Sequence, residues 1–290
     1  TQAAEQPRKV AQALTKLANN ARDRGDLEEA EARYKDALSA DPSYTGAYLQ
    51  LAFLYTQQER FEDALAIYKQ AVEADPENAE AHFRLGQAYR RAQQLDSAAA
   101  EFKRSAELDP TRYRALVQLG VVQVTQGKLD EAIASYESAL AINSNDPELR
   151  LELGQAYRQS GKMDKAIEQL KALIELQPEN SNGALQLAQT YIAQQKYDDA
   201  SKTLEDALTR APDLAPALFQ LGEVNRLQGN LAEAEARYIQ ALEADPSYTD
   251  AQLQLSDVYR AQGKTDEAAA ALDQALQAAG NTPEAAAALT

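Results

Sequence analysis

The chain has 290 residues, of which 44% are hydrophobic and 26% are charged, a balance that is typical of a folded protein. It has no cysteine, which excludes disulfide scaffolds, cysteine metal sites and thiol catalysis. The net charge of −16 repels phosphate backbones and anionic membrane surfaces, so we expect no nucleic-acid binding. No apolar run is long enough to span a bilayer, so we also expect no direct membrane insertion.

The first expected element, residues 1–10, is a lead-in that extends the opening helix. From residue 11 onward the sequence repeats with a period of 34 residues, which predicts a stacked repeat array. Two segments six periods apart, AEARYKDALSADPSYTGA from Ala30 and AEARYIQALEADPSYTDA from Ala234, are nearly the same. Prolines mark the period, with Ser144 at the one inner site that lacks a proline: Pro42, Pro76, Pro110, Pro178, Pro212 and Pro246.

Each repeat is predicted to hold two short amphipathic helices. In the third repeat, apolar residues recur at helical spacing, first around Phe83 and then around Phe102. A turn that often contains glycine separates the helices, and the proline ends the second helix. Leucine followed by a small residue fills one site of every first helix, as at Leu51 and Ala52. One site of the second helix holds only alanine, as close packing requires: Ala30, Ala64, Ala98, Ala132, Ala166, Ala200, Ala234 and Ala268.

These columns, written L-[GA]-x-x-Y, A-x-x-x-[YFL] and A-x-x-x-x-P, resemble the tetratricopeptide repeat (TPR) family over residues 11–282. The resemblance implies an all-α fold, a right-handed superhelical solenoid of stacked antiparallel helix pairs. Residues 283–290 are expected to form a partial C-terminal capping helix. The eight predicted repeats are 11–44, 45–78, 79–112, 113–146, 147–180, 181–214, 215–248 and 249–282.

The sequence offers no set of catalytic or metal-binding side chains. Its single histidine, His82, shares a column with Leu116 and Leu218, so we expect it to pack between helices. Acidic runs such as the one after Asp26 lie at the starts of second helices, where negative charge favours the helix dipole. We therefore predict a protein that is not an enzyme and that uses no cofactor and no metal.

The family resemblance implies that the first helix of each pair faces a concave groove. At the groove positions, an apolar stripe crosses repeats two to four, and arginines including Arg91 lie beside it. In an acidic protein, such arginines are suited to recognise carboxylates of a bound peptide. The predicted groove residues are Asn19, Leu49, Phe53, Phe83, Arg84, Arg90, Arg114, Val117, Val121, Val124 and Arg158.

The carboxylate clamp that some members of this family use for chaperone tails is not expected here. Of the residues at its positions in the first three repeats, only Asn19 and Arg84 match, and Glu80 would repel a carboxylate. A plainer alternative for the stripe is that it is partly core, with its arginines paired to Glu80, Glu148 and Glu152.

We expect a non-enzymatic scaffold or adaptor that binds a peptide or protein segment in the groove. One alternative is a self-associating structural array, which would be a homo-oligomer. Another is a TPR module of a larger bacterial envelope, secretion or photosystem-assembly component. The compartment stays unknown: the bacterial cytoplasm, the periplasm, or a membrane tether if an upstream signal or anchor was removed.

Overall fold

The computed structural model describes residues 2–278 of the chain. Within this range there are sixteen α-helices and no β-strand, which confirms the predicted all-α class. The helices divide into two compact units, Thr1–Ser144 and Asn145–Thr290. The capping helix expected at 283–290 lies outside the described residues.

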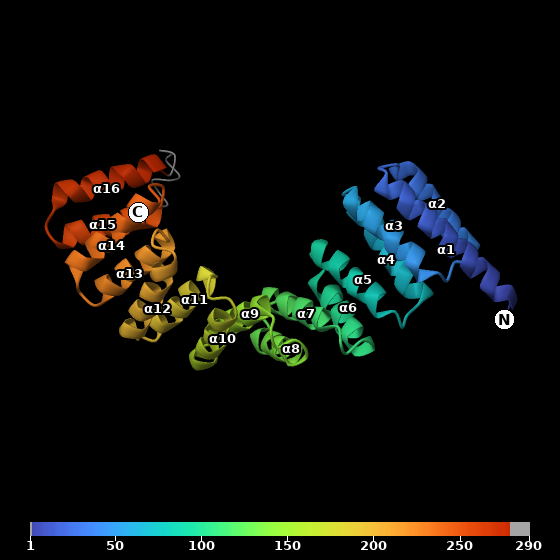
Figure 1. Cartoon of the computed structure of the whole chain (residues 1–290), viewed down its shortest axis with the longest axis horizontal. Helices are drawn as coiled ribbons and strands as arrows, with labels where there is room; N and C mark the ends of the chain where they lie inside the picture. Colours follow the sequence, from blue (N-terminus) through green and yellow to red (C-terminus); the bar gives the residue numbers. More distant parts are fainter. Residues whose placement is uncertain (1, 279–290) are drawn as a thin grey trace. The chain divides into compact units, whose positions relative to one another are not determined.

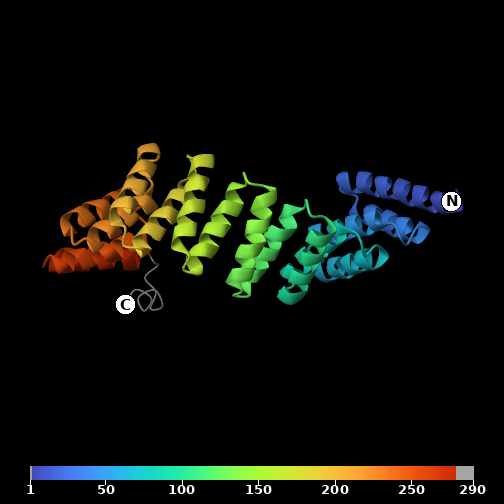
Figure 2. The same cartoon turned by 90° about the horizontal axis from the view of Figure 1, so that it is seen from below.

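Unit 1 holds four helix pairs, seen from two directions in Figures 1 and 2. Each first helix contacts its own second helix, and each second helix contacts the first helix of the following pair. The helices of unit 1 are α1 (Gln2–Asp23), α2 (Leu27–Ala40), α3 (Thr45–Gln57), α4 (Phe61–Ala74), α5 (Ala79–Arg91), α6 (Leu95–Leu108), α7 (Tyr113–Thr125) and α8 (Leu129–Ile142).

Unit 2 repeats the same arrangement, with contacts again between helices that are neighbours in the chain. Within the described range, no helix combines the length and apolar content that crossing a membrane requires. The helices of unit 2 are α9 (Pro147–Gln159), α10 (Met163–Leu176), α11 (Ser181–Ala193), α12 (Tyr197–Arg210), α13 (Ala215–Leu227), α14 (Leu231–Ala244), α15 (Thr249–Ala261) and α16 (Thr265–Ala278).

The second helices end two residues before the repeated proline site. α2 ends at Ala40, and the N–H of Asp41 donates to the carbonyl of Ala37 at 3.0 Å before Pro42 stops further winding. α8 ends at the equivalent residue, Ile142, although no proline follows it at the repeat site. The helix end is therefore set by the whole turn and not by proline alone.

The small residue of a first helix lets a large side chain of the paired helix, often an aromatic ring, come close. A Cβ atom on Gly120 would lie 2.5 Å from the Tyr136 ring, and one on Gly222 would lie 2.6 Å from the Tyr238 ring. Neither position has room for a side chain unless the ring moves. Ala132, from the alanine column, is 0% exposed. Small residues at these positions thus permit the close packing of each helix pair.

The turn between paired helices needs one residue in the left-handed region of φ. Gly25 and Gly161 supply it, with φ of 87° and 76°. In three turns a residue with a side chain takes this conformation instead: Glu59, Gln93 and Gln195.

Inside unit 1, the leucine column of the first helices packs against the preceding helix pair. Leu51 is 1% exposed and shares a hydrophobic cluster with Tyr34 of the pair before it. Leu17, the counterpart on α1, is 51% exposed. No helix pair precedes α1 within the described residues, so nothing there covers Leu17.

Candidate functional site

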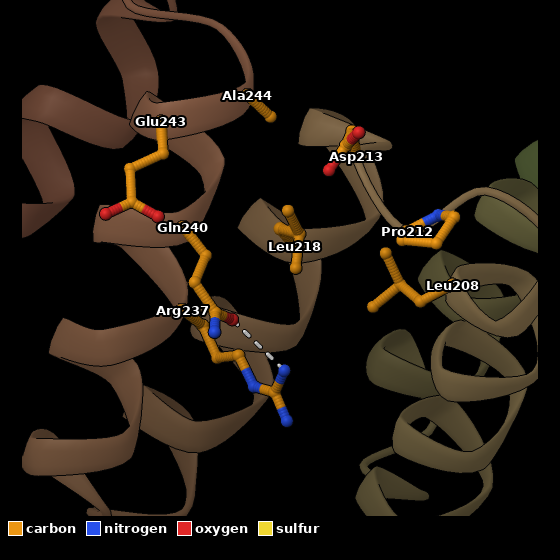
Figure 3. A pocket seen from close by; sticks show the side chains of 8 residues that line it. All are labelled: Leu208, Pro212, Asp213, Leu218, Arg237, Gln240, Glu243 and Ala244. Carbon is orange, nitrogen blue, oxygen red and sulfur yellow. Dashed lines mark hydrogen bonds between the residues drawn. The ribbon is translucent and has the colours of Figure 1, made fainter.

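One hollow of about 550 Å³ lies in unit 2, among α12, α13 and α14 (Figure 3). Its charges are mixed, because Asp213 and Glu243 line it together with Arg237. Arg237 donates to Gln240 at 3.2 Å. None of the predicted groove residues lines this hollow.

A second hollow, of about 510 Å³, lies between the first helices α3 and α5 of unit 1 and is called the α3–α5 hollow. It brings together three predicted groove residues, Phe53, Arg84 and Arg90. No residue that lines it carries a carboxylate, although the chain holds 45 Asp and Glu residues. Its other lining residues are Thr56, Tyr68, Gln87, Ala88, Arg91 and Gln93.

Phe53 replaces a residue that has a structural task in another repeat. In the first repeat, the Tyr34 hydroxyl donates to Asn19 at 2.6 Å, and Asn19 holds the position that Phe53 fills in the second. A phenyl ring cannot accept this bond, so the Tyr68 hydroxyl lacks the partner that Tyr34 has. It lies near the Thr56 side chain, which also lines the hollow. Phe53 is left 40% exposed, a high value for an aromatic residue on a helix of this unit.

Tyr68 supplies a buried hydroxyl to the same hollow. Tyr68 is 5% exposed, and burial raises the pKa of its phenol, against the opposing effects of the neighbouring Thr56 hydroxyl and the Arg84 charge. The phenol therefore stays protonated at neutral pH. In the sequence, Tyr68 stands at a site that serves packing in every repeat. The only sign that its hydroxyl needs another partner is that Phe53, unlike Asn19 in the first repeat, is not polar.

The three arginines of the α3–α5 hollow are held in different ways. Arg84 donates from Nε to Glu80 at 2.7 Å. The Arg91 guanidinium lies 3.5 Å from the centre of the Phe61 ring, and stacking of this kind leaves the in-plane N–H groups open. Arg90 and Arg91 are both exposed, and neither forms an ion pair with any described residue.

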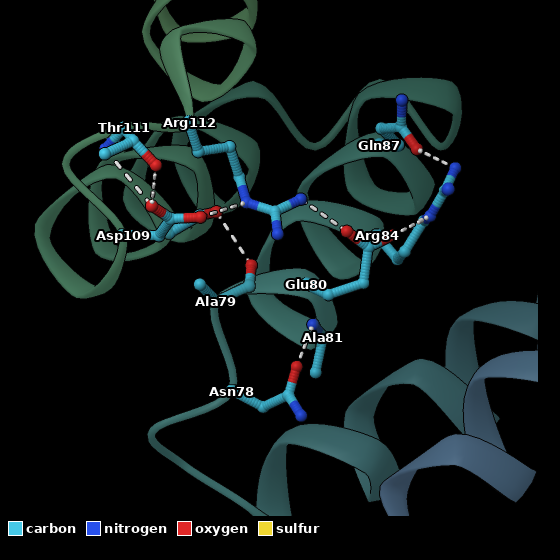
Figure 4. Close-up of polar contacts among 10 residues, drawn as sticks. Asn78, Ala79, Glu80, Ala81, Arg84, Gln87, Asp109, Thr111 and Arg112 are labelled. Carbon is cyan, nitrogen blue, oxygen red and sulfur yellow. Dashed lines mark hydrogen bonds and ion pairs between the residues drawn. The ribbon is translucent and has the colours of Figure 1, made fainter.

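Glu80 holds Arg84 in place and links α5 to the start of α7 (Figure 4). Its carboxylate accepts bonds from Arg84 on one side and from Arg112 on the other. Arg112 also pairs with Asp109 at 3.3 Å, and Arg84 donates to Gln87 at 3.2 Å. Burial raises the pKa of Glu80, but the two arginines outweigh it and hold that pKa below its usual value.

A smaller hollow of about 330 Å³, the α5–α7 hollow, lies on the other side of Arg84. It joins Phe83 and Arg114 to the Glu80 and Arg112 pair. Phe83 is only 8% exposed, and its ring centre lies 5.7 Å from that of Phe102. Phe83 is therefore mainly a core residue, as in the plainer alternative for this position.

The remaining predicted residues lie outside both hollows. Leu49 packs against the core of unit 1, and Asn19 accepts the bond from Tyr34. Arg158 lies on α9 of unit 2, where it donates to Gln189 at 2.8 Å. Three half-buried valines follow one another along α7: Val117, Val121 and Val124.

His82 is buried, as expected, but it is also fully hydrogen-bonded. Its Nδ1 lies 2.6 Å from Glu101 Oε2, and its Nε2 lies 3.0 Å from the carbonyl oxygen of Pro76. Gln252 occupies the same site of its repeat and donates to the carbonyl of Pro246, also at 3.0 Å. Both ring nitrogens of His82 are therefore committed to structure. Within the described residues, no group of three His, Asp or Glu side chains is placed to hold a metal ion.

Two family models match the chain. One, described as Cilia and flagella-associated protein 70 C-terminal domain, matches residues 1–217. The other, described as Tetratricopeptide repeat, matches residues 226–290. A comparison with curated proteins finds no match.

Several solved structures share the fold. YrrB, described as a TPR protein with an unusual peptide-binding site, is 25% identical with a TM-score of 0.57, over 64% of this chain and 95% of YrrB. MamA is 28% identical with a TM-score of 0.53, over 57% of this chain and 96% of MamA. A TPR repeat-containing protein from Cytophaga hutchinsonii is 15% identical with a TM-score of 0.68, over 83% of this chain and 99% of that one.

Proposed function

Because the chain belongs to the tetratricopeptide repeat family, we propose that it is a non-enzymatic scaffold that binds a peptide or protein segment along the first helices of unit 1. The observation that carries the proposal is Phe53, which is 40% exposed and lines the α3–α5 hollow. Covering an exposed aromatic ring favours association by roughly 1 kcal/mol or more. The peptide-binding site in the description of YrrB, a relative of the same fold, supports this use of the surface.

The contact surface would extend from the α3–α5 hollow across α5 to α7. Arg84 lines both hollows and lies between them, which makes it the centre of the proposed surface. Arg114 lines the second hollow, and the α7 valines would carry apolar contacts further along the same direction. Leu49 and Asn19 would border the surface on the side of α1 and α3. Arg158 would belong to a separate contact in unit 2.

A display library of random short peptides tests the proposal. We expect peptides to be enriched on the wild-type protein, and not on a double variant, Phe53→Asp with Val121→Asp, that places a charge on each of two first helices. The matched control is Ile142→Asp, which changes a residue of similar exposure, 43%, at the end of α8. It should bind the enriched peptides like the wild type.

Helical circular dichroism must show that the double variant is folded, as its exposed and half-buried positions lead us to expect. If the enriched peptides bind the folded double variant as tightly as the wild type, the proposed binding surface on the first helices is wrong. A wild-type protein that enriches no peptide would contradict peptide binding altogether.

The self-associating array and the module of a larger bacterial component stay as alternatives. The exposed Leu17 on α1 is the feature that would serve self-association, because a helix pair of a second copy would bury it as Leu51 is buried.

A further inference from the structure

We propose that the α3–α5 hollow is a subsite for a carboxylate side chain, Asp or Glu, that stands next to an aromatic or aliphatic residue in the bound peptide. The inference rests on the proposed function and names the chemical class of its ligand. It starts from the composition of the hollow, where Arg84, Arg90 and Arg91 meet and no acidic residue contributes. A concentration of positive charge of this kind is out of keeping with a chain whose net charge is −16.

The donors of these arginines are still available. Arg90 has no ion-pair partner among the described residues. Arg91 is fixed by stacking on Phe61, which orients the guanidinium but occupies none of its five N–H groups. Arg84 donates from Nε to Glu80 and from Nη1 to Gln87, and neither of these bonds uses its Nη2. Guanidinium groups bind carboxylates through paired, charge-assisted hydrogen bonds, so the hollow is suited to that ligand.

Phe53, the apolar side of the hollow, determines which residue is preferred next to the carboxylate. Phe53 stands on α3, facing the arginine-bearing helix α5 across the hollow. A ligand that places a carboxylate on the arginines therefore brings its neighbouring residue to the exposed Phe53 ring. A purely acidic segment would leave that ring uncovered, and a purely apolar segment would desolvate the arginines without pairing them, which is unfavourable.

The net negative charge of the whole chain does not prevent this recognition. At physiological ionic strength the Debye length is about 8 Å, so distant carboxylates of the protein are screened from the ligand. Among the residues that line the hollow, the three arginines carry the only charges. The neighbouring carboxylate of Glu80 is engaged by Arg84 and Arg112.

The test compares peptides that a display library of random sequences, with C-termini blocked by a carrier, yields on the wild type and on a double variant, Arg90→Gln with Arg91→Gln. We expect wild-type selections to be enriched in Asp or Glu beside an aromatic or aliphatic residue. On the double variant, the acidic enrichment should disappear while the apolar preference stays. The control, Arg24→Gln with Arg33→Gln, removes the same charge from two arginines of the first repeat, one exposed and one half-buried, and should behave as the wild type.

One enriched peptide is then synthesised with an amidated C-terminus and measured by fluorescence anisotropy. Changing its Glu or Asp to the amide should weaken binding by about tenfold or more, the usual scale for a charge-assisted hydrogen bond. The arginine double variant should bind the unchanged peptide more weakly by a similar factor, and the control variant should bind it as the wild type does.

Acidic enrichment that survives on the arginine double variant would overturn the subsite, as would a peptide whose amide version binds equally well. These outcomes differ from failure of the proposed function, because in each of them peptides still bind the wild type and lose affinity for the Phe53→Asp, Val121→Asp variant.

Discussion

Gln195 stands in the turn between α11 and α12 with φ of 58°, a conformation that glycine adopts at the same place in other repeats. For a residue with a Cβ atom, this left-handed region costs roughly 1–2 kcal/mol. Glycine loses more backbone entropy on folding, and this reduces its advantage over such a residue by about 0.5–1 kcal/mol. The turns at Glu59 and Gln93 carry the same cost, so the turn residue stabilises some repeats less than others.

We therefore expect Gln195→Gly to stabilise the protein by about 0.5–1 kcal/mol, seen as a higher midpoint of urea unfolding. The side chain of Gln195 is exposed, so no packing is lost. The reverse change at the equivalent turn, Gly161→Gln, should lower the midpoint by a similar amount. If both changes lower the midpoint, the left-handed turn is not the source of the cost.

The polar contacts of single residues also explain why the site could be predicted only in part. The sequence indicates Phe53, Arg84 and Arg91 because they differ from their counterparts in other repeats, whereas Arg90 shares its site with arginines of several other repeats. It does not show that Glu80 is held by Arg84 and Arg112, because Arg112 belongs to the turn before α7 and reaches back across α5. Contacts of this kind depend on side-chain conformations that no repeat pattern records.

At the scale of elements, the alanine column determines how closely two helices of a pair approach. Ala132 on α8 is 0% exposed, and α8 packs against α7, where Gly120 leaves no space beside Tyr136. We expect Ala132→Leu to cost about 1–3 kcal/mol by overpacking this contact. The measurement is thermal unfolding followed by circular dichroism.

Ala134→Leu is the matched control, since it makes the same change two residues further along α8 at an exposed position. It should leave the unfolding temperature almost unchanged. An equal loss of stability at both positions would refute the assignment of Ala132 to the packed face.

The helices themselves were predictable because two independent patterns agree on them. Helical spacing of apolar residues, as around Phe83 and Phe102, and turn residues at a fixed period define the same pairs. The depth of burial was less predictable, because it depends on neighbouring pairs. Leu17 and Leu51 hold the same site of the repeat, yet one is half exposed and the other is closed off.

At the scale of the whole molecule, acidic groups outnumber basic ones, 45 to 29, and their mutual repulsion opposes folding at neutral pH. In three turns an aspartate accepts bonds from a hydroxyl residue two positions later, as Asp41 does from Ser43, and this lowers the pKa of the aspartate. The pKa is lowered at Glu31, Asp41, Glu80, Asp109, Glu235 and Asp245.

These two effects predict how stability depends on pH. Carboxyl groups with a lowered pKa in the folded state stabilise it above the ordinary carboxyl pKa, and this contribution is lost as pH falls through the folded pKa. We expect Tm to rise as pH falls from neutrality toward the isoelectric point near 4.6, because repulsion fades while these groups stay ionised. Below about pH 4, Tm should fall, since the paired carboxylates protonate and the basic residues leave a large positive charge.

Differential scanning fluorimetry at low protein concentration checks this dependence. As a control, added salt should raise Tm at neutral pH, where repulsion is strong, and should change it little near the isoelectric point. A Tm that falls steadily from neutrality downward would mean that the paired carboxylates, and not the net charge, govern stability throughout.

The contacts counted between helices join helices of the same repeat or of adjacent repeats, which also bears on how such a protein evolves. A repeat needs only the repeats beside it, so duplication of one repeat inserts a unit that is compatible with its surroundings from the start. The near-identical segments from Ala30 and Ala234 are consistent with such an origin. After duplication, packing residues are held constant by their neighbours while a position such as Phe53 is free to diverge, so new binding preferences can arise without redesign of the fold.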